Sequence, residues 1–147
     1  MNLTRTATAV ALAVAALLAP LVTAPAASAT EDAVGCLDGS SPASFPGAST
    51  KKTITTTYGS IIELRYSTNT CAWGRLTSGA VGDYVWVDRA VGVSQGNSGD
   101  WVQLGITQLT SGTQVYTPGY NDNYRVMRAC AEVVEFFQHK VYCTGWY

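Results

Sequence analysis

The ionisable residues that could carry out catalysis are few, and their spacing does not group them. His139 is the only histidine, and it lies beside Lys140 in a predicted hairpin, where an exposed position is more typical than a general base. Glycoside hydrolysis would need two facing carboxylates, but spacing alone selects no pair. The acidic candidates are Glu63, Asp83, Asp88, Glu132 and Glu135. We therefore expect a protein that is not an enzyme. A catalytic interpretation would require Glu63, Asp83 and His139 to share one cleft.

The four cysteines could bind a metal or form disulfides. A zinc site is not expected, because the chain has no C-x-x-C pair and a single histidine, and no cofactor is expected either. Outside the cell four cysteines are expected to pair, in one of three connectivities. Cys130 and Cys143 are equidistant from the Phe136-Phe137 junction, so a hairpin centred there would place them opposite each other at a distance that a disulfide can bridge. Cys36 would then pair with Cys71.

Residues 1–29 have the features of a signal peptide. Arg5 precedes an apolar run from Ala9 to Leu18, and Ala27-Ser28-Ala29 fits a signal peptidase site. The apolar run is shorter than the roughly 20 residues that a membrane span needs. The sequence therefore predicts a secreted, extracellular protein whose mature chain begins at Thr30.

The charge of the mature chain excludes some classes of partner. Loss of Arg5 reduces nine basic residues to eight, against ten acidic residues, which gives a net charge of −2. Nucleic-acid binding and attachment to anionic lipid are not expected, because both require a basic surface. The run Ala33-Val34-Gly35-Cys36 is similar to a lipoprotein cleavage box, but Glu31 and Asp32 separate it from the apolar run. Lipid attachment and stable membrane insertion are therefore not expected.

The mature chain has the pattern of an all-β or mainly β domain. Short alternating or apolar segments are separated by turns rich in Gly, Pro, Asn and Ser, which is typical of a small disulfide-linked β-sandwich or barrel. Residues 30–50 are rich in Pro, Gly and Ser and predict an extended N-terminal tail, followed by a β-rich domain over residues 51–147. Residues 128–137 favour a strand, with a short helix as the alternative. The predicted strands cover residues 51–58, 61–67, 84–87, 101–109, 114–117, 125–133 and 140–147.

Core and surface positions follow from this pattern. The apolar run from Tyr84 to Val87 is typical of a strand buried on both faces, and Trp73 is expected to pack around the neighbouring disulfide. The predicted core residues are Leu64, Tyr66, Trp73, Val85, Trp86 and Val87. The predicted partner contacts lie in the tail and at less constrained aromatic residues. They are Thr30, Glu31, Asp32, Ala33, Val34, Trp101, Trp146 and Tyr147.

The segment from Ile61 to Arg75 carries a family resemblance. Glu63-Leu64-Arg65-Tyr66-Ser67, followed by Cys71-Ala72-Trp73-Gly74-Arg75, resembles the core of YjfA-like proteins, which are small, secreted, uncharacterised proteins of Gram-positive bacteria. Gly82-Asp83 and the closing Cys143-Thr144-Gly145-Trp146-Tyr147 also look similar. The chain departs from that family in having one cysteine near its N-terminus, where the family often has two. The resemblance implies no established activity.

In size, export signal and tail, the chain also resembles the adaptor subunits of secreted umbrella-type toxin particles. In those particles an N-terminal strap docks into a lectin-like partner. This weaker resemblance implies a non-catalytic, secreted adaptor that links other proteins in an extracellular assembly. A module that binds cell-wall or other polysaccharide is the alternative, and a small secreted hydrolase or inhibitor is the third reading.

Overall fold

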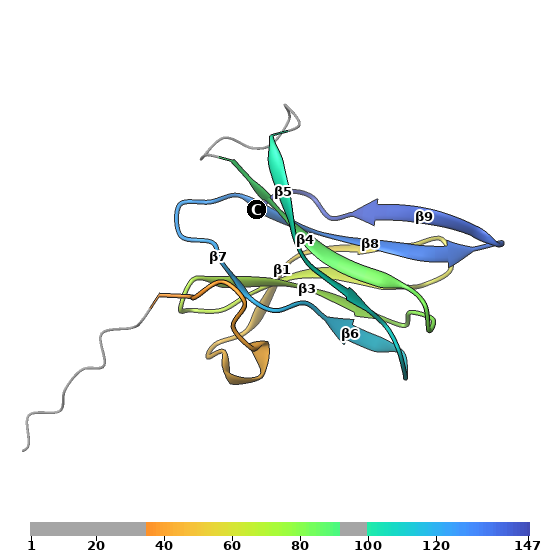
Figure 1. The fold of residues 1–147 in the computed structure, drawn as a ribbon, viewed down its shortest axis with the longest axis horizontal. Helices are drawn as coiled ribbons and strands as arrows, with labels where there is room; N and C mark the ends of the chain where they lie inside the picture. Colours follow the sequence, from red (N-terminus) through yellow and green to blue (C-terminus); the bar gives the residue numbers. More distant parts are fainter. Residues whose placement is uncertain (1–34, 92–99) are drawn as a thin grey trace, which may run out of the picture.

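The computed structural model describes residues 35–91 and 100–147. The predicted signal peptide and Thr30 to Val34 lie outside the described residues. Within the described ranges, no helix is both long enough and apolar enough to cross a membrane. The described chain forms two antiparallel sheets that pack face to face, so the predicted mainly β, disulfide-linked sandwich is confirmed (Figure 1).

The first sheet has the order β1-β2-β3-β6, and β7 pairs with β3 beside β6. The strand predicted over residues 61–67 is present, because alternation over Ile61 to Tyr66 buries Ile62 and Leu64 on one face. Glu63 and Arg65 lie on the other face. The strands are β1 (Ser49–Thr55), β2 (Ile61–Tyr66), β3 (Cys71–Thr77), β6 (Gln114–Tyr116) and β7 (Tyr120–Asn121).

The second sheet has the order β5-β4-β8-β9. Its strands are β4 (Tyr84–Ala90), β5 (Trp101–Gln108), β8 (Met127–Glu135) and β9 (Gln138–Cys143). Residues 128–135 belong to a strand, not a helix, because Ala129, Ala131 and Val133 alternate into the core. Cys130 pairs with Cys143 in the register, and the two form a disulfide, as the symmetry of the hairpin predicts.

The core lies between the sheets. Leu64, Val85 and Val87 are fully buried as predicted, and Tyr66 packs against the core while remaining partly exposed. Both sheets contribute to this cluster, so neither can bury its apolar face without the other. Its buried members are Ile62, Leu64, Ala72, Leu76, Val85, Val87, Met127, Ala129, Ala131 and Val133.

The prediction that β4 is buried on both faces is wrong, and so is the placement of Trp86 in the core. Trp86 lies between the buried Val85 and Val87 and therefore points to the outer face of the second sheet, where it stays partly exposed. Only one face of β4 is covered by the other sheet, so an aromatic residue in the alternating position remains outside. The indole Nε1 of Trp86 donates a hydrogen bond to Asp88 at 3.0 Å.

The segment from Cys36 to Phe45, which we call the strap, packs on the outer face of the first sheet. It contains a short 3₁₀ helix, Pro42–Ser44, and is joined to β3 by the Cys36–Cys71 disulfide. The ring of Phe45 lies 5.2 Å from that of Trp73. Trp73 is therefore buried as predicted, and the strap is the element that covers it.

Candidate interaction surface

Five residues meet on the outer face of the second sheet and form what we call the Arg128 cluster: Trp86, Asp88, Trp101, Arg128 and Trp146. Strand alternation places Trp86 and Asp88 on one face of β4, opposite Cys130 and Arg128 of β8. Trp101 opens β5 opposite Ala90 and reaches the same face. Trp146 lies in the segment that follows β9. Residues 60 positions apart in the chain thus share one surface.

Arg128 is the centre of this cluster. Its guanidinium carbon lies 4.6 Å from the ring centroid of Trp146 and 5.0 Å from that of Trp101, so the cation lies over both indoles. Its Nε donates to Oδ2 of Asp88 at 2.9 Å. Asp88 is only 2% exposed, and its other oxygen accepts the Trp86 bond. A buried carboxylate with two donors therefore fixes the arginine, and the arginine fixes the two tryptophans.

The predicted aromatic contacts do not form one patch. Trp101 and Trp146 lie together in the Arg128 cluster, while Tyr147 belongs to another group. The ring of Tyr147 packs edge-on against Tyr66 at 5.8 Å, and Lys51 lies over both of these rings. The tail contacts Thr30 to Val34 lie outside the described residues. Sequence reasoning found two members of the cluster and missed Asp88 and Arg128 as partners.

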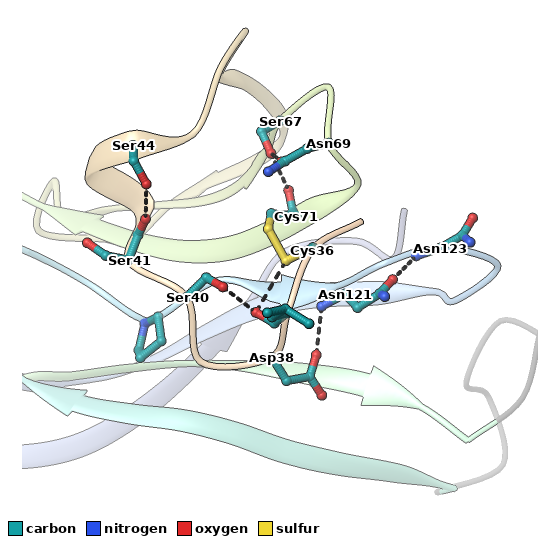
Figure 2. Close-up of a disulfide and its surroundings, with 12 residues drawn as sticks. Cys36, Asp38, Ser40, Ser41, Ser44, Ser67, Asn69, Cys71, Asn121 and Asn123 are labelled. Atoms are coloured by element: carbon teal, nitrogen blue, oxygen red, sulfur yellow. Dashed lines mark hydrogen bonds between the residues drawn. A yellow bond between two sulfur atoms is a disulfide. The ribbon is translucent and has the colours of Figure 1, made fainter. Parts of the chain in front are cut away.

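The strap closes one end of the sandwich. In Figure 2, Asp38 turns toward Asn121, whose backbone N–H donates to the Asp38 carboxylate at 2.8 Å. Arg89 of β4 donates to the same carboxylate at 2.9 Å and to the carbonyl of Asn121 at 3.3 Å. The strap is thus bound to the first sheet by a disulfide at Cys71 and to the second sheet by the ion pair with Arg89.

A polar pocket of about 420 Å³ lies beside this ion pair, with Asp38, Arg89 and Arg125 in its lining. The neighbouring Asp122 is buried, and its Oδ1 has no hydrogen-bond partner. Burial raises the pKa of Asp122 from 3.8 to about 7, against the opposing effect of the Arg89 charge. Asp122 therefore binds a proton in the folded chain over a pH range in which the unfolded chain has released it.

This raised pKa predicts a stability that falls as the pH rises. Between pH 3.8 and about 7 the folded state holds one more proton than the unfolded state at Asp122, so each step up in pH favours unfolding. Asp122→Asn mimics the protonated form and should be more stable than the wild type at about pH 8, with a smaller difference at about pH 5. Thermal unfolding at both pH values measures this, with Glu132→Gln on the other sheet as the control. An equal shift at the two pH values would contradict the assignment.

The residues considered for catalysis have separate sets of partners. Glu63 accepts from Thr50 and lies near Arg65 and Arg75 on the outer face of the first sheet. Asp83 is buried and accepts two backbone N–H groups, and His139 pairs with Glu132 at 2.7 Å on an exposed part of β9. No shared hydrogen bond or ion pair joins Glu63, Asp83 and His139 in the described part of the chain.

Two short hydrolase-like patterns also occur in the sequence. Gly92 to Gly96 reads G-x-S-x-G, a pattern that needs a turn from a strand into a helix. The pattern lies outside the described residues and connects β4 to β5, which are paired antiparallel strands. Ser49 to Lys52 reads S-x-x-K, but it runs along the edge strand β1, whose extended backbone separates the two ends by about 10 Å. The pattern of Ser49 to Lys52 therefore lacks the structural context that its chemistry requires.

One group of metal-ligand types exists in the described ranges. It brings Asp88 together with Cys130 and Cys143 within 4.8 Å. The two cysteines are bonded to each other, so neither offers a thiolate to a metal. The Cys130 sulfur lies 3.4 Å from the Asp88 carboxylate as a packing contact, since a disulfide has no S–H to donate.

Comparison of the chain with models of protein families, with curated proteins and with solved structures finds no match. The resemblances to YjfA-like proteins and to toxin-particle adaptors therefore remain predictions. Two disulfides do indicate an oxidising environment, which is typical of extracellular proteins.

Proposed function

We propose that this protein is a secreted, non-catalytic adaptor that binds other proteins, and that the Arg128 cluster is one of its contact surfaces. The observation that carries this proposal is the arginine held between two partly exposed tryptophans. Trp and Arg are the residue types that dominate binding energy at protein interfaces. Trp101 is 39% exposed, so an apolar ring is available to a partner at the position where Arg128 has already fixed it.

The fixed geometry supports binding because little freedom remains to be lost. Arg128 is bound to a buried carboxylate and lies over both rings, so its side chain and those of Trp101 and Trp146 are ordered before a partner arrives. Ordering of side chains on association normally costs about 0.5–1.5 kcal/mol for each flexible residue. A surface that is ordered in advance avoids much of this cost.

The same geometry favours a protein partner over a polysaccharide. Sugar rings stack on open aromatic faces, and here the guanidinium already covers one face of each indole. The charge of Arg128 is balanced by Asp88, so the surface offers partly exposed aromatic rings and a neutralised cation. These features suit the mixed aromatic and polar centre of a protein interface.

Capture from culture supernatant tests the proposal. The tagged mature protein should retain specific secreted proteins, and Trp101→Ala should weaken their binding at least tenfold while the fold, measured by thermal unfolding, persists. Tyr116→Ala removes an exposed aromatic residue from the first sheet and serves as the matched control. Retention of polysaccharide without protein, or equal capture by Trp101→Ala and wild type, would contradict the assignment.

A further inference from the structure

The turn between β8 and β9 is built from residues that suit neither its backbone nor its solvent exposure. Glu135 pairs with Gln138, so Phe136 and Phe137 alone form the turn. Both have left-handed backbone angles, with φ of 48° and 62°. Two-residue hairpin turns of this kind strongly prefer Asn-Gly, because bulky L residues disfavour positive φ. Local conformation therefore does not account for two phenylalanines here.

Solvation does not account for them either. Phe137 is 100% exposed and Phe136 is 73% exposed. The ring of Phe136 packs edge-on against that of Tyr58 at 4.8 Å, which adds a third exposed aromatic from the β1–β2 turn. The turn that joins β8 and β9, which contains both phenylalanines, lies at the projecting end of this hairpin (Figure 1). An exposed group of apolar side chains on a secreted domain marks a contact site.

The hairpin is rigid behind this turn. The Cys130–Cys143 disulfide joins its two strands at the base, and the register continues without a bulge to Glu135 and Gln138. Glu135 is buried next to the turn and accepts hydrogen bonds from the Tyr142 hydroxyl at 2.7 Å and from Lys140 at 3.3 Å. The two rings are therefore presented on a fixed support.

The charges near the turn indicate the kind of partner. Near the turn, Glu135 pairs with Lys140 and Glu132 pairs with His139, and Arg128, farther along the hairpin, pairs with Asp88 of β4. Binding to anionic lipid depends on unpaired basic residues near the surface, and the hairpin offers no excess of them in the described structure. A projecting phenylalanine with neutral surroundings fits an apolar socket on another protein, where a single aromatic anchor supplies much of the binding energy.

We propose that Phe137, supported by Phe136 and Tyr58, is an anchor that inserts into an apolar socket of a secreted protein partner. This inference rests on the proposed adaptor function and adds a second contact surface to it. Phe136 directly follows β8 and lies eight residues from Arg128, about 26 Å at the rise of an extended strand. The two surfaces are therefore at opposite ends of one strand, and each is able to hold a different protein.

A variant that improves the turn separates binding from folding. Phe136→Asn combined with Phe137→Gly installs the preferred turn and should raise the midpoint of thermal unfolding. The same double variant should lower capture of the socket protein from culture supernatant at least tenfold. In a second measurement, a benzophenone amino acid placed at position 137 should cross-link to that protein on illumination. The same group at Tyr124, an exposed residue outside the hairpin, should not.

Each other outcome overturns the inference in a recognisable way. If Trp101→Ala reduces capture but the Asn-Gly variant does not, Phe137 is not an anchor. The proposed adaptor function is then still supported. Absence of any captured protein overturns both. Sedimentation of the wild type, but not the variant, with phosphatidylcholine–phosphatidylserine vesicles would assign the turn to a membrane. A dimer in analytical ultracentrifugation that the variant abolishes would assign it to a second copy of this chain.

Discussion

Arg128→Met should lower the free energy of unfolding by about 3–5 kcal/mol, the usual cost of removing one partner from a buried ion pair. The reason is the position of Asp88, whose side chain is 3% exposed and whose Oδ2 lies 2.9 Å from Arg128 Nε. Without the guanidinium, that carboxylate keeps only the Trp86 hydrogen bond and remains a largely uncompensated charge. Urea unfolding followed by tryptophan fluorescence measures the loss.

Arg65→Met is the matched control for this prediction. Arg65 pairs with Glu63 at 3.8 Å on the outer face of the first sheet, and Glu63 is 16% exposed and keeps Arg75 at 3.5 Å when Arg65 is removed. We therefore expect a loss of about 0–1 kcal/mol. The double variant Asp88→Asn, Arg128→Met should recover part of the stability, because no charge is then buried. A loss for Arg128→Met no greater than that for Arg65→Met would mean that Asp88 reaches water when its partner is removed.

Replacement of Cys36 and Cys71 by alanine should cost roughly 4 kcal/mol, the chain-entropy value for a closed loop of this length. The disulfide spans 35 positions, and it also holds the strap against Trp73 and beside Arg89. The strap should then become accessible to limited proteolysis in the folded protein. Urea unfolding of the purified double variant gives the energy, and a protease time course shows where cleavage begins.

Removal of the other disulfide provides the comparison. Cys130 and Cys143 are 13 positions apart and already face each other in a paired hairpin. Their replacement by alanine should cost roughly 3 kcal/mol on the same chain-entropy scale, with no change in proteolysis of the strap. If replacement of Cys130 and Cys143 lowered the free energy of unfolding more than replacement of Cys36 and Cys71, the length of the closed loop would not determine how much each disulfide contributes to stability.

The sequence predicts the hairpins better than the surfaces. Cys130 opposite Cys143 follows from symmetry about the Phe136-Phe137 turn, and the burial of Leu64 follows from alternation, because both are local geometry. Trp86 was misplaced because an aromatic residue between two valines fits both a core strand and a half-covered one. The packing of the other sheet on one face of β4 decides between the two, and the local sequence does not contain that information.

The Arg128 cluster depends on contacts that local patterns do not contain. Asp88 and Arg128 become neighbours through the pairing of β4 with β8, and Trp101 joins them through the pairing of β4 with β5. The anchor turn is a different case, because its signal was present in the sequence. Phe136 and Phe137 occupy positions where a tight turn prefers Asn-Gly, and such a local conflict often marks a functional position.

The placement of the Cys36–Cys71 disulfide determines how the fold would respond to mechanical force. A pull on the chain before Cys36 passes through the covalent bond into β3, an interior strand paired with β2 on one side and with β6 and β7 on the other. The residues between the two cysteines, which include the edge strand β1, carry none of that tension. The sandwich should thus resist peeling from its N-terminal edge, as the proposed adaptor function would require.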